Sequence, residues 1–72
     1  METVLDRLID TLNRTDWHYE YSDDPREYRR GRASVDRAMK AIEEAKAIDP
    51  TGTIKVIETH RSIPDTKRQY LI

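Results

Sequence analysis

The sequence predicts an α+β fold in which two helices pack against a C-terminal β-hairpin. Three observations lead to this prediction. Two stretches place apolar residues at helical spacing, the segment after residue 50 is rich in β-branched residues, and turn-forming residues at 62–66 divide that segment in two. With 72 residues, the chain has room for a single small domain, residues 1–72.

The first helix is predicted at residues 2–13, where apolar side chains recur on one face. They are Val4, Leu5, Leu8, Ile9 and Leu12, a spacing typical of an amphipathic helix. A different face carries acids four residues apart, which are Glu2, Asp6 and Asp10. Acids near a helix start suit the helix dipole, and this acidic face is also a candidate partner-binding surface.

A short strand is a further possibility at residues 17–21, where aromatic and polar residues alternate with period two. A helix start follows directly. Asp24 is a good N-cap, Pro25 fits the first helical position, and Glu27 has the spacing of a capping box.

The second helix is predicted over residues 25–47. Large residues repeat every seven positions on one face, at Tyr28, Val35 and Ile42. Small residues lie between them, which permits close approach of a neighbouring segment, and Gly31 marks a kink or a tight crossing. The helix should end near Asp49 and Pro50, because proline lacks the N–H donor.

The C-terminal third is predicted to form the hairpin, with strands at residues 53–60 and 67–72. Residues 53–59 are rich in β-branched side chains. Because an isolated hairpin is only marginally stable, it should pack on the helices or pair with the segment at 17–21.

Composition narrows the classes of function. The chain has no cysteine and only two histidines, His18 and His60, in no ligand-spaced motif, so neither a metal nor another cofactor is expected. No nucleophile–base arrangement is evident, so an enzyme is not expected. No apolar run is long enough to cross a membrane, and the start of the chain lacks the basic and apolar stretches of a signal peptide, so we expect a cytoplasmic protein.

A chain of this length has a thin core. It buries about 60% of the surface that its unfolded form exposes. Natural domains of this size that lack disulfides and metals gain stability from good helix packing or from self-association. A homodimer is therefore expected.

Charge is unevenly spread along the chain, with −5 in residues 1–24, +3 in residues 25–47 and +1 in residues 48–72. The large aromatic side chains gather beside arginines between residues 17 and 32. These residue types dominate binding hot spots. The candidate partner-binding residues of this stretch are Trp17, Tyr19, Tyr21, Arg26, Arg29, Arg30 and Arg32.

Two questions stay open for this stretch. The first is whether its aromatic side chains form the core or lie at the surface. The second concerns the arginines. The arginines pair with nearby acids or are solvated, or they contact a protein partner or a phosphate-bearing ligand. The nearby acids are Glu20, Asp23, Asp24 and those of the first helix.

The stretch 17–31, WHYEYSDDPREYRRG, resembles a segment of short, mostly uncharacterised proteins of bacteriophages and prophages. The resemblance implies a small phage accessory protein, a class that includes inhibitors of host defence such as anti-CRISPR proteins. It carries over no site residues.

Two functional hypotheses follow. In the first, the chain is a non-enzymatic interaction module that inhibits a host defence complex through the surface at residues 17–32 and the acidic face of the first helix, which mimics nucleic acid. In the second, it is an oligomeric binder of a nucleotide or nucleic acid, whose arginines hold phosphate while a tyrosine stacks on a base.

Overall fold

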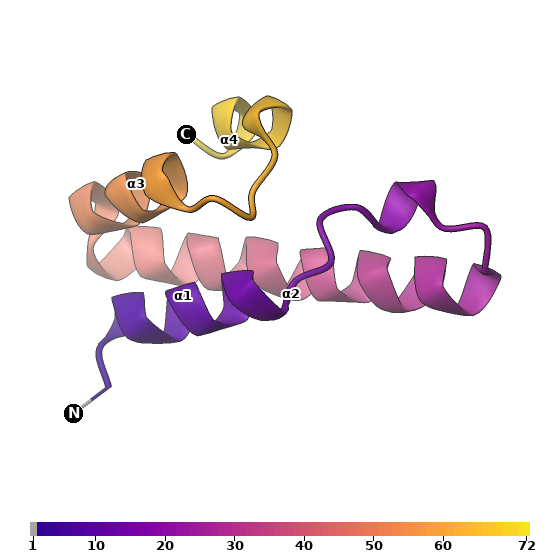
Figure 1. The fold of residues 1–72 in the computed structure, drawn as a ribbon. Helices are drawn as coiled ribbons and strands as arrows, with labels where there is room; N and C mark the ends of the chain where they lie inside the picture. The colour runs from indigo at the N-terminus through magenta and orange to yellow at the C-terminus, as the bar shows by residue number, and fades with distance from the viewer. Residues whose placement is uncertain (1) are drawn as a thin grey trace.

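The computed structural model describes residues 2–72, and its regular elements are all helical (Figure 1). They are α1 (Val4–Arg14), the 3₁₀ turn η1 (Tyr19–Tyr21), α2 (Pro25–Ile48), α3 (Pro50–Thr59) and α4 (Asp65–Leu71). The two predicted helices are confirmed as α1 and α2. The predicted α+β class is wrong, since residues 2–72 contain no strand.

Helix α1 begins with a capping box that the sequence analysis did not identify. The Asp6 backbone N–H donates to the Thr3 hydroxyl (3.1 Å), and the Thr3 N–H donates to the Asp6 carboxylate (3.1 Å). Two amide donors that have no helical partner are thereby satisfied. Leu8 and Leu12, from the predicted apolar stripe, are buried against the rest of the core.

The possible strand at residues 17–21 is not formed, and η1 takes its place. Trp17 anchors the segment: its side chain is buried, and its indole N–H donates to the Leu12 carbonyl (3.3 Å). The segment then passes over α2 at Gly31. A Cβ atom added to Gly31 would lie 2.2 Å from the Cβ of Tyr19, so only glycine leaves room for this approach. The expected tight crossing at Gly31 is thus a crossing by η1.

Helix α2 begins as predicted at Asp24, whose carboxylate accepts the Arg26 N–H (2.9 Å), with Pro25 in the first turn. The expected role of Glu27 differs. Its carboxylate accepts the Ser22 hydroxyl (2.9 Å) instead of reaching back to the N-cap backbone. Glu27 therefore ties the end of η1 to the first turn of α2.

The first predicted hairpin strand, 53–60, is largely occupied by α3. Asp49 ends α2 and also caps α3, because its carboxylate accepts the Gly52 N–H (3.0 Å). Thr53 and Ile57, four residues apart, are both fully buried. The β-branched residues thus lie at helical spacing on one face, and tertiary packing overrides their strand preference.

The second predicted strand, 67–72, is largely occupied by α4. Pro64 precedes the helix, and Asp65 lies in its first turn, where an acid is favourable. Arg68 holds the preceding loop by donating to the carbonyls of Ile63 (3.1 Å) and Glu58 (3.0 Å). With these bonds made locally, no partner strand is needed.

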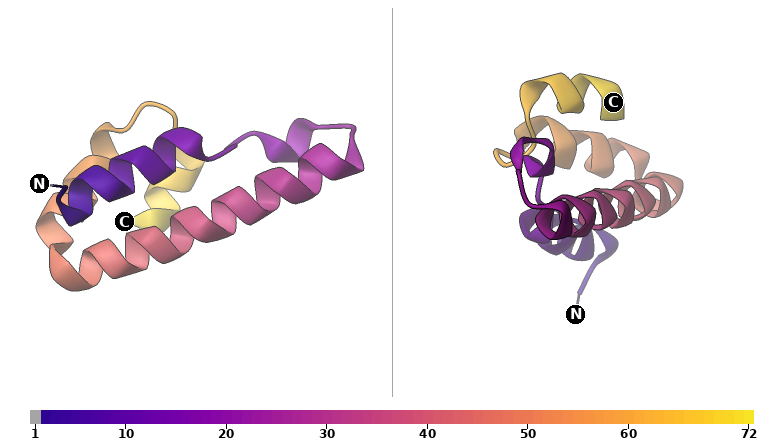
Figure 2. Two further views of the ribbon diagram at one scale, coloured as in Figure 1. Left: turned by 90° about the horizontal axis from the view of Figure 1, so that it is seen from below. Right: turned by 90° about the vertical axis from the view of Figure 1, so that its right-hand side faces the viewer.

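The core lies where α1, the C-terminal part of α2 and α3 meet. Helices α1 and α2 run antiparallel side by side, with α3 and α4 stacked over the C-terminal part of α2 (Figure 2). The buried apolar residues are Leu8, Leu12, Trp17, Val35, Ala38, Ile42, Ala45, Ile57, Ile63 and Leu71. The N-terminal part of α2 extends beyond α1 and beneath η1 (Figures 1 and 2).

Candidate functional site

The N-terminal part of α2 carries a concentration of positive charge that we call the arginine arm, residues 25–40. It has six cations and two acids, Glu27 and Asp36, which gives a formal net charge of +4. All six cations are exposed: Arg26, Arg29, Arg30, Arg32, Arg37 and Lys40. Arg26, Arg29, Arg30 and Arg32 were predicted site residues, and the structure places them together on one helix.

The cations of the arginine arm are not neutralised by ion pairs within residues 2–72. Four pairs occur in that range: Arg7–Glu2 (3.7 Å), Arg14–Asp10 (3.4 Å), Lys67–Glu20 (3.7 Å) and Arg68–Asp65 (2.6 Å). None involves α2. The alternative in which these arginines pair with the acids of the first helix or of residues 20–24 is therefore not realised.

A polar hollow of ≈ 530 Å³ runs along the α1 side of the arm. Arg14, Arg30 and Arg37 contribute guanidinium groups to it, beside Asp16 and Glu27. Both acids already accept hydrogen bonds, Asp16 from the His18 N–H (3.1 Å) and Glu27 from Ser22. The guanidinium groups of Arg30 and Arg37 have no carboxylate within 4.0 Å among the described residues, and so are available to an external anion.

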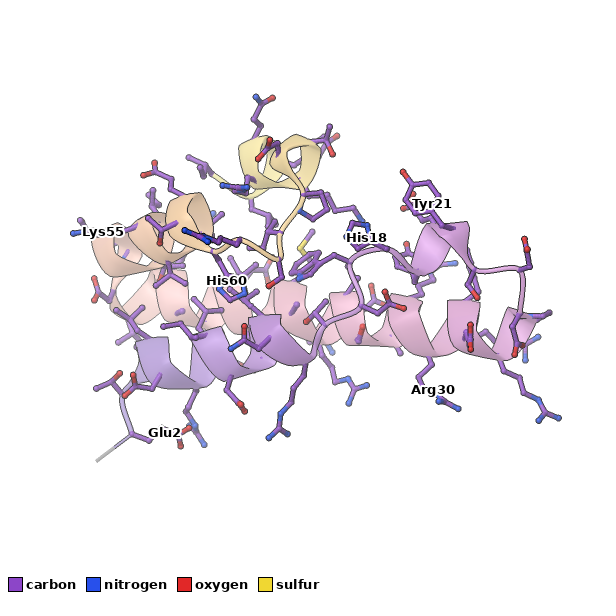
Figure 3. The ribbon with its side chains drawn as sticks, in the orientation of Figure 1. Glu2, His18, Tyr21, Arg30, Lys55 and His60 are labelled. Carbon is purple, nitrogen blue, oxygen red and sulfur yellow. The ribbon has the colours of Figure 1, made fainter. Side chains whose placement is uncertain are left out.

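The aromatic and arginine residues do not form one continuous surface. Trp17 is 4% exposed and belongs to the core, so its side chain is not available to a partner. Tyr19 packs edge-on against Tyr28, with ring centroids 5.1 Å apart. Tyr21 is 84% exposed, but it lies on the opposite side of α2 from Arg30 (Figure 3). A single nucleotide is therefore not expected to stack its base on Tyr21 and place its phosphate on Arg30 at the same time.

The acidic face of α1 is largely engaged within the helix. Asp6 closes the capping box, Glu2 pairs with Arg7, and Asp10 pairs with Arg14. Surface pairs of this kind are weak, but the two arginines place positive charge on the face that was expected to mimic nucleic acid. The predicted sites Glu2, Asp6 and Asp10 thus form a surface of mixed charge.

An apolar cleft of ≈ 240 Å³ lies between α2 and α4, and sequence reasoning missed it. Its lining residues are Trp17, Val35, Met39, Thr66, Lys67, Tyr70 and Leu71. Tyr70, at its rim, is 91% exposed. Only a correct assignment of α4 as a helix indicates this cleft, because a strand at residues 67–72 places these side chains differently.

One histidine lies beside a hydroxyl: His60 Nε2 is 2.6 Å from the Ser62 Oγ. Burial, and then the charge of Arg68, lowers the pKa of His60 below the usual 6.5, which favours the neutral imidazole. A Ser–His pair in a catalytic site also has a third group that orients the histidine. None of the hydrogen bonds formed by residues 2–72 supplies one to His60.

Within residues 2–72, no group of three or more histidines, cysteines or acids is arranged to hold a metal ion. In the same range, no helix combines the length and apolar character needed to cross a membrane. Comparison with known protein families, with curated proteins and with solved structures finds no match to this chain.

Proposed function

We propose that this protein is a non-enzymatic binding module that contacts an anionic macromolecule through the arginine arm. The observation that carries the proposal is the set of six exposed cations on α2 without a carboxylate partner in residues 2–72. Nearby like charges raise the electrostatic free energy of the free protein, and an anionic partner relieves that repulsion.

The geometry favours the arm over the other predicted surfaces. The acidic face of α1 contains its own counter-charges, and Trp17 is buried. The N-terminal part of the arm, in contrast, extends beyond α1 (Figure 1). A partner therefore reaches it without disturbing the core.

The proposal fits both earlier hypotheses about the partner. An inhibitor of a host defence complex would bind an acidic surface of that complex, and a nucleic-acid binder would bind phosphates. The role in phage anti-defence rests on the resemblance of residues 17–31 and stays a prediction, as do the homodimer and the location in the host cytoplasm.

The test is binding of the full chain to immobilised heparin as a generic polyanion, measured by biolayer interferometry over a salt titration. We expect binding that weakens steeply with salt. The variant Arg29→Gln/Arg30→Gln/Arg37→Gln should lose it. Lys55→Gln/Arg61→Gln removes two cations from α3 and the following loop, away from the arm, and should bind nearly as well as the unmodified chain.

Two results would contradict the proposal. Heparin binding that is absent at low salt would show that the arm does not recognise polyanions. Equal losses in the arm variant and in the Lys55/Arg61 variant would show that only net charge matters. Circular dichroism of each variant confirms that the helices are intact.

A further inference from the structure

We infer that the arginine arm lies side-on in the major groove of double-stranded DNA and contacts phosphates on both walls of the groove. This inference rests on the proposed function and names its partner. The first support is the distribution of charge around the helix. At 100° per residue, the arc from Arg32 to Arg30 covers about 160° of the circumference. The other four cations lie within that arc.

An arc of this width distinguishes a groove from a flat surface. A flat acidic protein surface contacts a helix along one narrow face, so cations at the two edges of a wide arc do not reach it. In the major groove, an α-helix has phosphates on both sides, because the groove is about as wide as the helix, roughly 12 Å. Arg30 and Arg32 lie at the two edges of the arc and would face opposite walls.

The middle of the arc permits close approach. Ala33 lies there and is exposed, so the helix backbone can approach the groove floor without a bulky side chain between them. Asp36 is also in the arc and is exposed, and it is the one acid in the arc within residues 25–40; Glu43 and Glu44 lie in the same arc beyond the end of the arm. Its charge opposes binding to a polyanion.

The end of the helix sets the orientation. Asp23 and Asp24 precede the first turn and are exposed, so entry into the groove by the helix tip would bring carboxylates against phosphates. Side-on docking avoids this repulsion. From Arg26 to Lys40 the arm extends about 21 Å at 1.5 Å per residue, long enough to cross from one wall of the groove to the other.

Residue types in the arm predict little sequence specificity. Residues 25–40 contain no asparagine or glutamine, the side chains that pair with adenine in the major groove. Arginine can pair with guanine, but phosphate contacts dominate a set of six cations. Affinity should therefore depend on salt far more than on sequence.

The experiment measures fluorescence anisotropy of a short, labelled, mixed-sequence duplex as the full chain is added at several salt concentrations. Six phosphate contacts give a slope of log K against log salt of about −5. Arg30→Gln/Arg32→Gln should make this slope shallower by about 2, one for each lost contact. Lys55→Gln/Arg61→Gln should leave it unchanged, and Asp36→Asn should raise the affinity severalfold.

A second duplex locates the groove. Its cytosines carry glucosylated hydroxymethyl groups, which fill the major groove and leave the phosphates in place. We expect the affinity to fall about tenfold or more, because cytosine C5 substituents project into that groove. Unchanged affinity would overturn the inference.

Other probes separate this inference from the proposed function. Single-stranded DNA of the same sequence and polyglutamate should both bind more weakly than the duplex. If either binds as tightly, the groove assignment is overturned, but the arm remains a polyanion-binding surface. If the duplex, the single strand, polyglutamate and heparin all fail to bind, both proposals are overturned.

Discussion

The C-terminal half of α2 is enclosed by α1 and α3, whereas its N-terminal part is exposed apart from the side that η1 covers (Figure 1). In the enclosed half, Ala38 and Ala45 are fully buried, and small side chains let the neighbouring helices approach closely. In the arginine arm, most positions face solvent, and six of the sixteen residues are cations. One helix thus performs two tasks, because its two halves have different surroundings.

The comparison predicts that substitutions affect stability strongly in the enclosed part and only slightly in the arm. The largest effect is expected for Ile57→Ala on α3, which contacts the enclosed half and is fully buried. Loss of its side chain should lower the free energy of unfolding by about 2–5 kcal/mol, measured by urea denaturation followed by circular dichroism. Arg29→Ala in the arm should change it by less than about 0.5 kcal/mol. Similar losses in the two variants would contradict the division of α2.

A substitution at Gly31 tests the point where the arm packs tightly against η1. Gly31→Ala introduces a Cβ that would lie 2.2 Å from the Tyr19 Cβ, so η1 must shift. Overpacking costs about 1–3 kcal/mol, and the higher helix propensity of alanine returns up to about 1 kcal/mol.

The net result should be a less stable protein with weaker Tyr19–Tyr28 contacts in NMR spectra. The control, Ala33→Gly, should be destabilised through helix propensity alone, with those contacts unchanged. A stabilised Gly31→Ala variant would show that η1 does not pack on α2 as described.

The two Asp-Pro pairs allow a matched test of the helix ends. Asp49→Ala and Asp24→Ala each remove one N-cap hydrogen bond, which contributes about 1 kcal/mol. Loss at Asp49 should lower global stability, because it lies between α2 and α3 in the packed region. Loss at Asp24 should mainly speed hydrogen exchange in the first turns of the arm. The comparison fails if exchange at residues 25–30 is unaffected by Asp24→Ala.

The smallest effect concerns pH and His60. Its pKa is lowered in the folded state, chiefly by burial and next by Arg68, so the unfolded chain takes up this proton first as the pH falls. Stability should therefore be highest above pH 6.5, and it should decline as the pH falls from 6.5 through the lower folded pKa. His60→Gln should flatten this part of the pH–stability curve. A curve that is as steep in the variant as in the unmodified chain would exclude His60 as the source.

The two helices of the N-terminal half were predictable from sequence because their signals are local, whereas the short strand expected at residues 17–21 is not formed. The apolar stripe of α1 and the Asp24-Pro25 start of α2 both correspond to observed elements. In the C-terminal part both predicted strands are largely replaced by helices, and the first error can be traced to one pair of residues. Asp49-Pro50 repeats the signal of Asp24-Pro25, but it was interpreted only as a helix end, and the β-branched residues that follow favoured a strand. In the structure, Asp49 ends one helix and begins the next.

The candidate site was predictable in composition but not in arrangement. Sequence placed Arg26, Arg29 and Arg30 on one helix, yet it did not show whether acids elsewhere would neutralise them. That depends on where the chain folds back, and residues 16–24 turn so that their carboxylates do not pair with the arm. The burial of Trp17 was also undecided, because it depends on contacts with residues distant in sequence.

The continuity of α2 has a consequence for the energetics of binding. Because the arm and the packed C-terminal part of α2 belong to one helix of 24 residues, the backbone of the arm is helical before any partner binds. Its backbone conformational entropy is lost once, during folding, and does not have to be lost again on association. Only the arginine side chains must be immobilised, at roughly 0.5–1.5 kcal/mol each, so the arm is a preorganised ligand-binding element.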